Sequence, residues 1–188
     1  MLQKRLFKSV LSAAAIAGCF ATGNLAVQAQ GALPSFRWNN REGFNELKNV
    51  IELSDAPNRW GRYRIKIGAR DMELAASQFV VNYPDYFNGK FNADEIEIRV
   101  CSSTGSFLSR AKCSAVEMDE VEVDTENYRI ALYPLEPIPA GSNLELVFDD
   151  VKNPRNRGMY QFNVLVESPG ELPILRNVGA SILDISGR

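Results

Sequence analysis

Hydrophobic and polar residues alternate along most of this chain with a period of two. The pattern is strongest at residues 62–67, 95–100, 144–148 and 160–166; in the first of these, Tyr63, Ile65 and Ile67 alternate with basic residues. Shorter alternating segments cover residues 78–81, 121–123, 128–133 and 181–185. Alternation of this kind is typical of strands that bury one face. The sequence therefore predicts about eight strands.

Turn-forming residues separate the alternating segments. Asn88-Gly89 and Asn153-Pro154 are examples, and prolines and Gly141 interrupt the stretch before residue 144. Apolar residues recur at the spacing of a helix only in residues 41–51 and 71–76, so we expect only one or two short helices. Many short strands with regular turns favour an all-β sandwich over alternating strands and helices.

An acidic run covers residues 117–126, and the alternation slips by one position at Asp119-Glu120. A slip of one residue predicts a β-bulge. The acidic side chains offer the oxygen ligands that calcium prefers, but the run lacks the glycine of an EF-hand loop. A solvated strand face explains the same residues, so both interpretations stand at this point.

The first 29 residues differ in character from the rest. Lys4, Arg5 and Lys8 precede an apolar stretch at residues 10–20, and the segment ends in Val27-Gln28-Ala29. This order predicts a signal peptide, residues 1–29, cleaved after Ala29. Residues 16–19 (IAGC) also fit a lipobox, in which Cys19 would carry a lipid anchor. The apolar stretch is shorter than the roughly 20 residues of a spanning helix, so we expect no transmembrane span in the mature chain.

Cleavage after Ala29 would leave an extension at residues 30–61, with a short helix packed on the sandwich, and a sandwich domain at residues 62–188. The removed segment holds three cationic and no acidic residues, so the formal net charge falls from −2 to about −5. An anionic surface repels phosphate backbones, so we expect no nucleic-acid partner.

The chain contains no histidine, which excludes histidine-based triads and histidine-ligated metal sites. No phosphate-binding loop, dinucleotide-binding glycine motif or serine nucleophile elbow is present. We therefore expect no catalytic residue, no cofactor and no metal. A hydrolase with two carboxylates is the remaining enzymatic alternative, and it needs two such groups about 5–10 Å apart across a groove.

Two cysteines, Cys101 and Cys113, remain after the signal segment, and a turn-rich stretch lies between them. In an oxidising compartment this pair predicts a disulfide that closes a loop between two strands. Two unpaired thiols are the alternative. A metal site would need two further ligands, which the lack of histidine makes hard to supply.

The densest aromatic segment is residues 83–87 (YPDYF). Tyr83, Tyr86 and Phe87 could form a platform for a sugar ring or a protein partner, in which case they would be exposed and roughly coplanar. Alternatively, they fasten a loop onto the core, where aromatic rings bury most area. Arg155 and Arg157 could similarly contact an anionic glycan, although exposed charges on a turn need no such function.

Two later stretches carry a resemblance to a known family. Residues 138–146 (IPAGSNLEL) lead into residues 151–162 (VKNPRNRGMYQF), and the YPDYFNG segment precedes them. Over residues 63–185 the chain resembles an uncharacterised secreted family common in cyanobacteria, a domain of unknown function. The resemblance implies an antiparallel immunoglobulin-like β-sandwich in the periplasm, the outer envelope or outside the cell, and supplies no catalytic residue. We therefore expect an exported, non-catalytic module with a binding or structural role, whose partner is an envelope protein or a polysaccharide.

Overall fold

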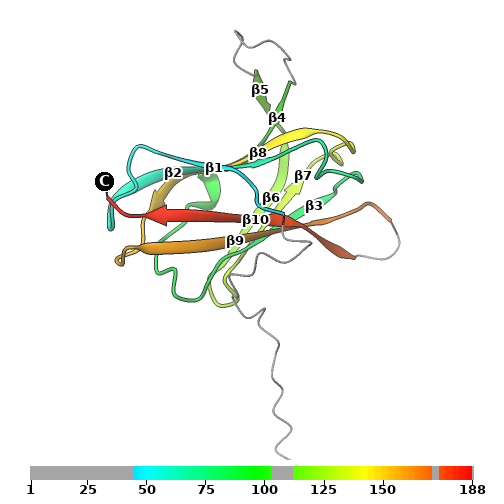
Figure 1. The fold of residues 1–188 in the computed structure, drawn as a ribbon. Coiled ribbons are helices and arrows are strands. Elements are labelled where there is room, and N and C mark those ends of the chain that lie inside the picture. Colours follow the sequence, from blue (N-terminus) through cyan, green and yellow to red (C-terminus); the bar gives the residue numbers. More distant parts are fainter. Residues whose placement is uncertain (1–44, 103–111, 171–173, 188) are drawn as a thin grey trace, which may run out of the picture. The chain divides into compact units, whose positions relative to one another are not determined.

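The computed structural model describes residues 45–102, 112–170 and 174–187, which form ten strands and one short 3₁₀ helix (Figure 1). The strands are β1 (Asn49–Glu52), β2 (Trp60–Ile67), β3 (Gln78–Asn82), β4 (Ile96–Cys101), β5 (Cys113–Ala115), β6 (Met118–Asp124), β7 (Arg129–Pro134), β8 (Asn143–Lys152), β9 (Gly158–Glu167) and β10 (Leu175–Ile185). The helix η1 (Ala93–Glu95) precedes β4. The all-β prediction is confirmed.

The strands form two five-stranded antiparallel sheets. One has the order β1-β2-β8-β4-β5 and the other β10-β9-β3-β7-β6, so the inner pairs of each sheet join strands that are distant in the sequence. The two sheets pack face to face as a sandwich (Figure 1). Tyr160, near the start of β9, donates a hydrogen bond from its hydroxyl to the Asn156 carbonyl, 2.8 Å away. Such a tyrosine corner is a feature of immunoglobulin-like sandwiches.

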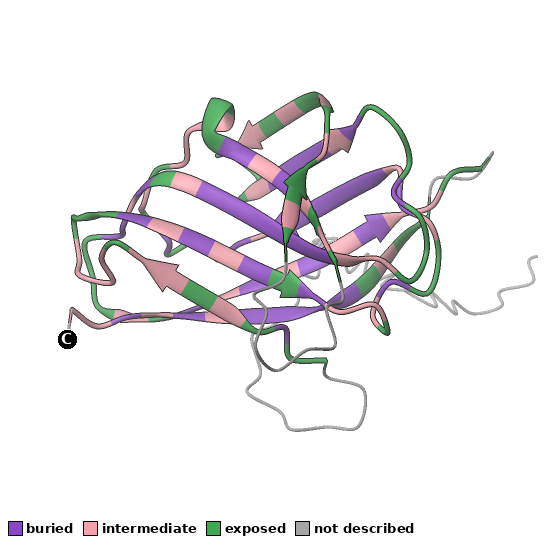
Figure 2. Ribbon diagram, turned by 90° about the horizontal axis from the view of Figure 1, so that it is seen from above, coloured by how far each residue is buried: buried purple, intermediate pink, exposed green. Residues whose placement is uncertain are grey.

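The core lies between the sheets and follows the alternation of the sequence. Figure 2 shows buried positions alternating with more exposed ones along the strands. Tyr63, Ile65 and Ile67 of β2 are fully buried, as are Phe162 and Val164 of β9. Each inward row therefore contributes apolar area to a single hydrophobic cluster, the main source of stability for the fold.

All eight expected strands are present, and two more, β1 and β5, had no alternating signal. The slip in the acidic run is also real, because the pairing of β6 with β7 shifts its register between Met118 and Glu120. The carboxylates of this run lie on an edge strand, and Asp124 accepts hydrogen bonds from the backbone of residues 126 and 127. Charged residues on an edge strand discourage pairing with other chains.

The two expected helices are wrong where the structure describes them. Residues 49–52 form β1, because Asn49 to Glu52 pair with Ile65 to Arg62 of β2. Just before it, the Leu47 amide donates to the Ala180 carbonyl at 2.8 Å, so this segment follows the edge of β10. At residues 71–76, the Asp71 carboxylate accepts from the Gly68 amide across a turn, at 3.0 Å, and no helix follows. Pairing with the sheets overrides weak helical spacing at both places.

The expected division of the chain at residue 62 is too late, since β1 and the start of β2 already belong to a sheet. The signal segment 1–29, Cys19 and residues 30–44 of the expected extension lie outside the described residues. Within the residues that are described, no helix is both long and apolar enough to cross a membrane.

Candidate functional site

A disulfide joins Cys101, at the end of β4, to Cys113, at the start of β5. The two residues are direct partners in the antiparallel register, with their Cα atoms 4.0 Å apart. The predicted disulfide is therefore present, and it closes the β4–β5 hairpin, which projects from the sandwich (Figure 1). It links β5, the outermost strand of its sheet, covalently to β4, although β5 has only three residues.

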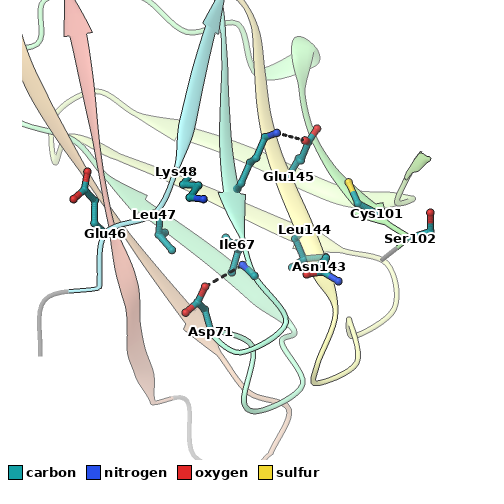
Figure 3. Close-up of a pocket in the computed structure, with 12 residues that line it drawn as sticks. Glu46, Leu47, Lys48, Ile67, Asp71, Cys101, Ser102, Asn143, Leu144 and Glu145 are labelled. Carbon is teal, nitrogen blue, oxygen red and sulfur yellow. Dashed lines mark hydrogen bonds and ion pairs between the residues drawn. The ribbon is translucent and has the colours of Figure 1, made fainter. Parts of the chain in front are cut away.

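A pocket of about 490 Å³ lies beside this disulfide (Figure 3). The segment before β1 supplies Leu47 and Lys48, the end of β2 supplies Lys66 and Ile67, and the start of β8 supplies Asn143, Leu144 and Glu145. Cys101 and Ser102 complete the wall on the β4 side. Its volume is in the range of small-molecule sites. The apolar residues of this lining, Leu47, Ile67 and Leu144, are themselves buried, and the polar ones carry charges of both signs.

Most polar groups in this pocket already have partners. The Asp71 carboxylate accepts from the Asn45 side chain at 2.8 Å and from the Gly68 amide. The Asn143 side-chain oxygen accepts from the Ala69 amide at 3.0 Å. Lys48 and Glu46 are the exceptions, because no ion pair to either is found within the described part of the chain. The Lys48 ammonium is the cation most available to a ligand, and the Glu46 carboxylate is available as well.

Glu145 is the least exposed acid of the pocket and is held by two cations. Its carboxylate lies 3.5 Å from the Lys66 ammonium and 3.7 Å from the Arg64 guanidinium. Further along the same outer face, Arg62 pairs with Asp149. Hydrogen bonding from Arg62 lowers the pKa of Asp149 below its ordinary value, against a smaller opposing effect of burial. These pairs hold the side chains of β2 and β8 in fixed positions.

Metal binding at this pocket has one candidate ligand set. The sulfurs of Cys101 and Cys113 and a carboxylate oxygen of Glu145 lie within 4.8 Å of one another, the only such group found among the described residues. Sulfurs joined in a disulfide are not thiolates, and thiolates are the metal-binding form of cysteine. The oxidised structure therefore presents no set of three metal ligands here.

Of the two interpretations of the aromatic segment, the structure favours a loop fastened to the core. Tyr83 is 7% exposed and Phe87 is 3% exposed, and both pack around Phe162 inside the core. Only Tyr86 reaches the surface, at 51% exposure, with its ring 5.4 Å from that of Tyr160. The platform hypothesis is wrong for two of its three residues, and the alternative, a loop fastened to the core, describes them correctly.

The sequence did not single out the residues that line the pocket. Lys48, Lys66, Asn143 and Glu145 come from three separate segments of the chain. Each is an ordinary polar position of a strand or turn, and only the pairing of β2 with β8 brings Lys66 beside Glu145. The expected pairing of Cys101 with Cys113 was the one sequence signal that pointed to this region.

Comparisons with solved structures find similar folds at low sequence identity. BslA, a bacterial hydrophobin, is 13% identical with a TM-score of 0.49, covering 79% of this chain and 98% of its own. The collagen-binding subdomain of the Enterococcus faecalis surface protein ACE is 6% identical with a TM-score of 0.43, covering 77% and 99%. The collagen-binding domain of a Staphylococcus aureus adhesin is 8% identical with a TM-score of 0.38, covering 72% and 93%.

No curated protein was found to match the chain. A family model does match, and it extends over residues 36–185, which include every strand of both sheets. It starts before β1 and ends with β10, so the matched unit corresponds to the whole sandwich. The chain therefore belongs to the DUF2808 family, whose description is a protein of unknown function.

Proposed function

We propose that this chain is exported from the cytosol and acts as a non-catalytic binding module of the cell envelope. The observation that carries the proposal is the disulfide between Cys101 and Cys113 at the edge of a sheet. Structural disulfides persist in oxidising compartments and are rare in the cytosol. The basic and apolar leader at residues 1–29 supports the same route.

The arrangement of the pocket supports binding rather than hydrolysis. A two-carboxylate mechanism needs one group to act as an acid and the other as a base or nucleophile. Here the Asp71 carboxylate is occupied by two hydrogen bonds, and that of Glu145 lies between two cations. Paired carboxylates of this kind position neighbouring side chains. The Lys48 ammonium, which has no ion pair among the described residues, instead favours a small polar ligand with an acidic group, and the Glu46 carboxylate favours a basic group on the same ligand.

Export can be tested by fractionating cells that express the full chain and measuring its intact mass without reductant. We expect the chain in the envelope or outside the cell, beginning at Gln30 or carrying a diacylglycerol on Cys19. Reduction should add about two mass units as the disulfide opens. A chain that stays in the cytosol with two free thiols would contradict the proposal.

Ligand binding at the pocket can be tested by NMR with a panel of envelope-derived sugars, amino acids and short peptides. Ligands that bind there should shift the amide resonances of residues 46–48, 66–68 and 143–145 together. Lys48→Ala should abolish those shifts, whereas Arg70→Ala, at an exposed position on the adjacent turn, should preserve them. Shifts confined to other surfaces would remove the pocket from the proposal and leave export untouched.

A further inference from the structure

Three loops that are distant in the sequence meet at the end of the sandwich where β2 begins. The Asn58 amide donates to the Pro154 carbonyl at 3.1 Å, and the Asn153 amide donates to the Arg59 carbonyl at 2.8 Å. Lys90 and Lys152 exchange two backbone hydrogen bonds, each of 2.9 Å. Residues 58–60, 84–90 and 152–159 therefore form one continuous surface, which we call the basic end.

The basic end is strongly cationic, although the whole chain has a formal net charge of −2. Its three segments hold five cations and a single acid, Asp85. The cations are Arg59, Lys90, Lys152, Arg155 and Arg157. All but Lys152 are exposed, and none of the five has an ion pair within the described part of the chain. On the outer face of β2, by contrast, the cations are paired with acids.

Exposed rings lie among these cations. Trp60 is 52% exposed, and the Lys152 ammonium lies 5.1 Å from the centre of its ring. Tyr86 is half-exposed, and its hydroxyl donates to the Met159 carbonyl at 3.4 Å. Indole and phenol rings offer flat faces for sugar rings, while arginine forms paired hydrogen bonds with carboxylate and sulfate groups.

The loops of the basic end are fixed before any ligand arrives. The buried Asn153 side chain donates to the Ser54 and Ala56 carbonyls and accepts from the Tyr63 hydroxyl. The Asn88 side chain accepts from the Arg155 amide at 2.8 Å and so ties the second loop to the third. Fixed loops reduce the entropy that binding would otherwise cost.

From these observations we infer that the basic end binds an anionic polysaccharide, one that carries carboxylate or sulfate groups on its sugar rings. Arg155 and Arg157 contact the acidic groups, and Trp60 stacks against a ring. The inference rests on the proposed export, which places the chain where such polymers occur. An anionic membrane would be attracted by the same charges, but the three segments expose few apolar side chains, Trp60, Tyr86 and Met159, among five cations.

Affinity electrophoresis and calorimetry of the full chain test the inference with two probes, a polyuronate and dextran sulfate, and neutral dextran as the control polymer. We expect binding to both anionic polymers, weakening between about 50 and about 300 mM salt, and none to dextran. The double variant Arg155→Ala/Arg157→Ala should weaken binding at least about tenfold. Trp60→Ala should also weaken binding, but the dependence of the affinity on salt concentration should stay the same, because stacking involves no charge.

Arg70→Ala is the matched control, since Arg70 is an exposed arginine that has no ion pair with any described residue and lies beyond the opposite end of β2. It should bind like the unmodified chain. Equal losses at Arg70 and at the arginine pair, or unchanged binding in the double variant, would overturn the inference. So would binding to phosphatidylglycerol vesicles without binding to either polymer. All these measurements use purified chain, so a failure of export in cells is detected separately.

Discussion

Asn153 connects the basic end to the core, and its replacement is the most informative test of the structure. The side chain is 1% exposed and takes part in three hydrogen bonds. Its oxygen accepts from the Tyr63 hydroxyl at 2.7 Å, and its nitrogen donates to the Ser54 and Ala56 carbonyls at 2.9 and 2.8 Å. Asn153→Ala removes all three bonds and leaves a buried hydroxyl and two carbonyls without their partner.

The magnitude follows from the cost of unsatisfied groups. A buried polar group that loses its partner costs about 1–3 kcal/mol, with the lower value where water can reach it. The two carbonyls belong to a loop and lie at the lower end, whereas the Tyr63 hydroxyl is deep in the core. Asn153→Ala should therefore lower the free energy of unfolding by about 3–5 kcal/mol. That is a large share of the roughly 5–15 kcal/mol typical of a domain.

Urea denaturation, followed by tryptophan fluorescence, measures this loss. Tyr63→Phe should lower the free energy of unfolding by about 1–2 kcal/mol, because it leaves only the Asn153 oxygen without its donor. The double variant should be little less stable than Asn153→Ala alone, since the two residues share one bond. Asn156→Ala, at an exposed position of the same loop, should change stability by less than about 0.5 kcal/mol. A loss below about 1 kcal/mol for Asn153→Ala, or strict additivity with Tyr63→Phe, would refute the network.

Three further predictions concern the disulfide and two ionisable groups. Cys113→Ser should lower the melting temperature by removing a cross-link worth about 3 kcal/mol, and reductant should reproduce this loss in the unmodified chain. Arg62 lowers the pKa of Asp149 in the folded chain, so the ionised carboxylate stabilises the fold above about pH 4. This contribution, at most about 1 kcal/mol, should disappear as the pH falls through the pKa of Asp149 in the folded chain. Asp149→Asn should remove that part of the pH dependence of stability. Burial raises the pKa of Tyr63, so in an ultraviolet titration it should ionise last, and stability should fall as the pH rises above about 10.

The sequence pattern identified strands well where one face is buried and the other is solvated. It missed β1 because Asn49 to Glu52 show no alternation and are held by pairing with β2 and by the Asn49 side chain, which donates to Ser181 and to the Ile182 carbonyl. It missed β5 because three residues are too few to show a period. Both strands form because they can pair with a strand at the edge of the sheet, β2 or β4. Such an edge exists only once the sheet has assembled, so the local sequence does not reveal it.

The burial of Tyr83 has a signal in the sequence beyond its aromatic character. Phe79 and Val81 point into the core from β3, and Tyr83 continues the same parity two residues later. Extending the alternation past the end of the strand would have predicted that Tyr83 is buried. The exposure of Tyr86 has no comparable signal, because it depends on a loop whose path is set by contacts with Tyr160 and Met159.

The cluster of cations at the basic end arises only because the topology of the sandwich brings three loops together. Arg155 and Arg157, considered alone, are two exposed charges on one turn, and charges on a turn are common. In the antiparallel sandwich, the connections before β2, after β3 and between β8 and β9 meet at one end, which places three more cations and Trp60 beside them. Because these side chains lie outside the core, replacing Arg155 and Arg157 should leave the melting temperature unchanged while weakening polymer binding at least about tenfold. Asn153→Ala removes the buried hydrogen bonds that hold the loops, so it should reduce both the melting temperature and polymer binding. This contrast separates residues that contact the polymer from residues that only support the loops.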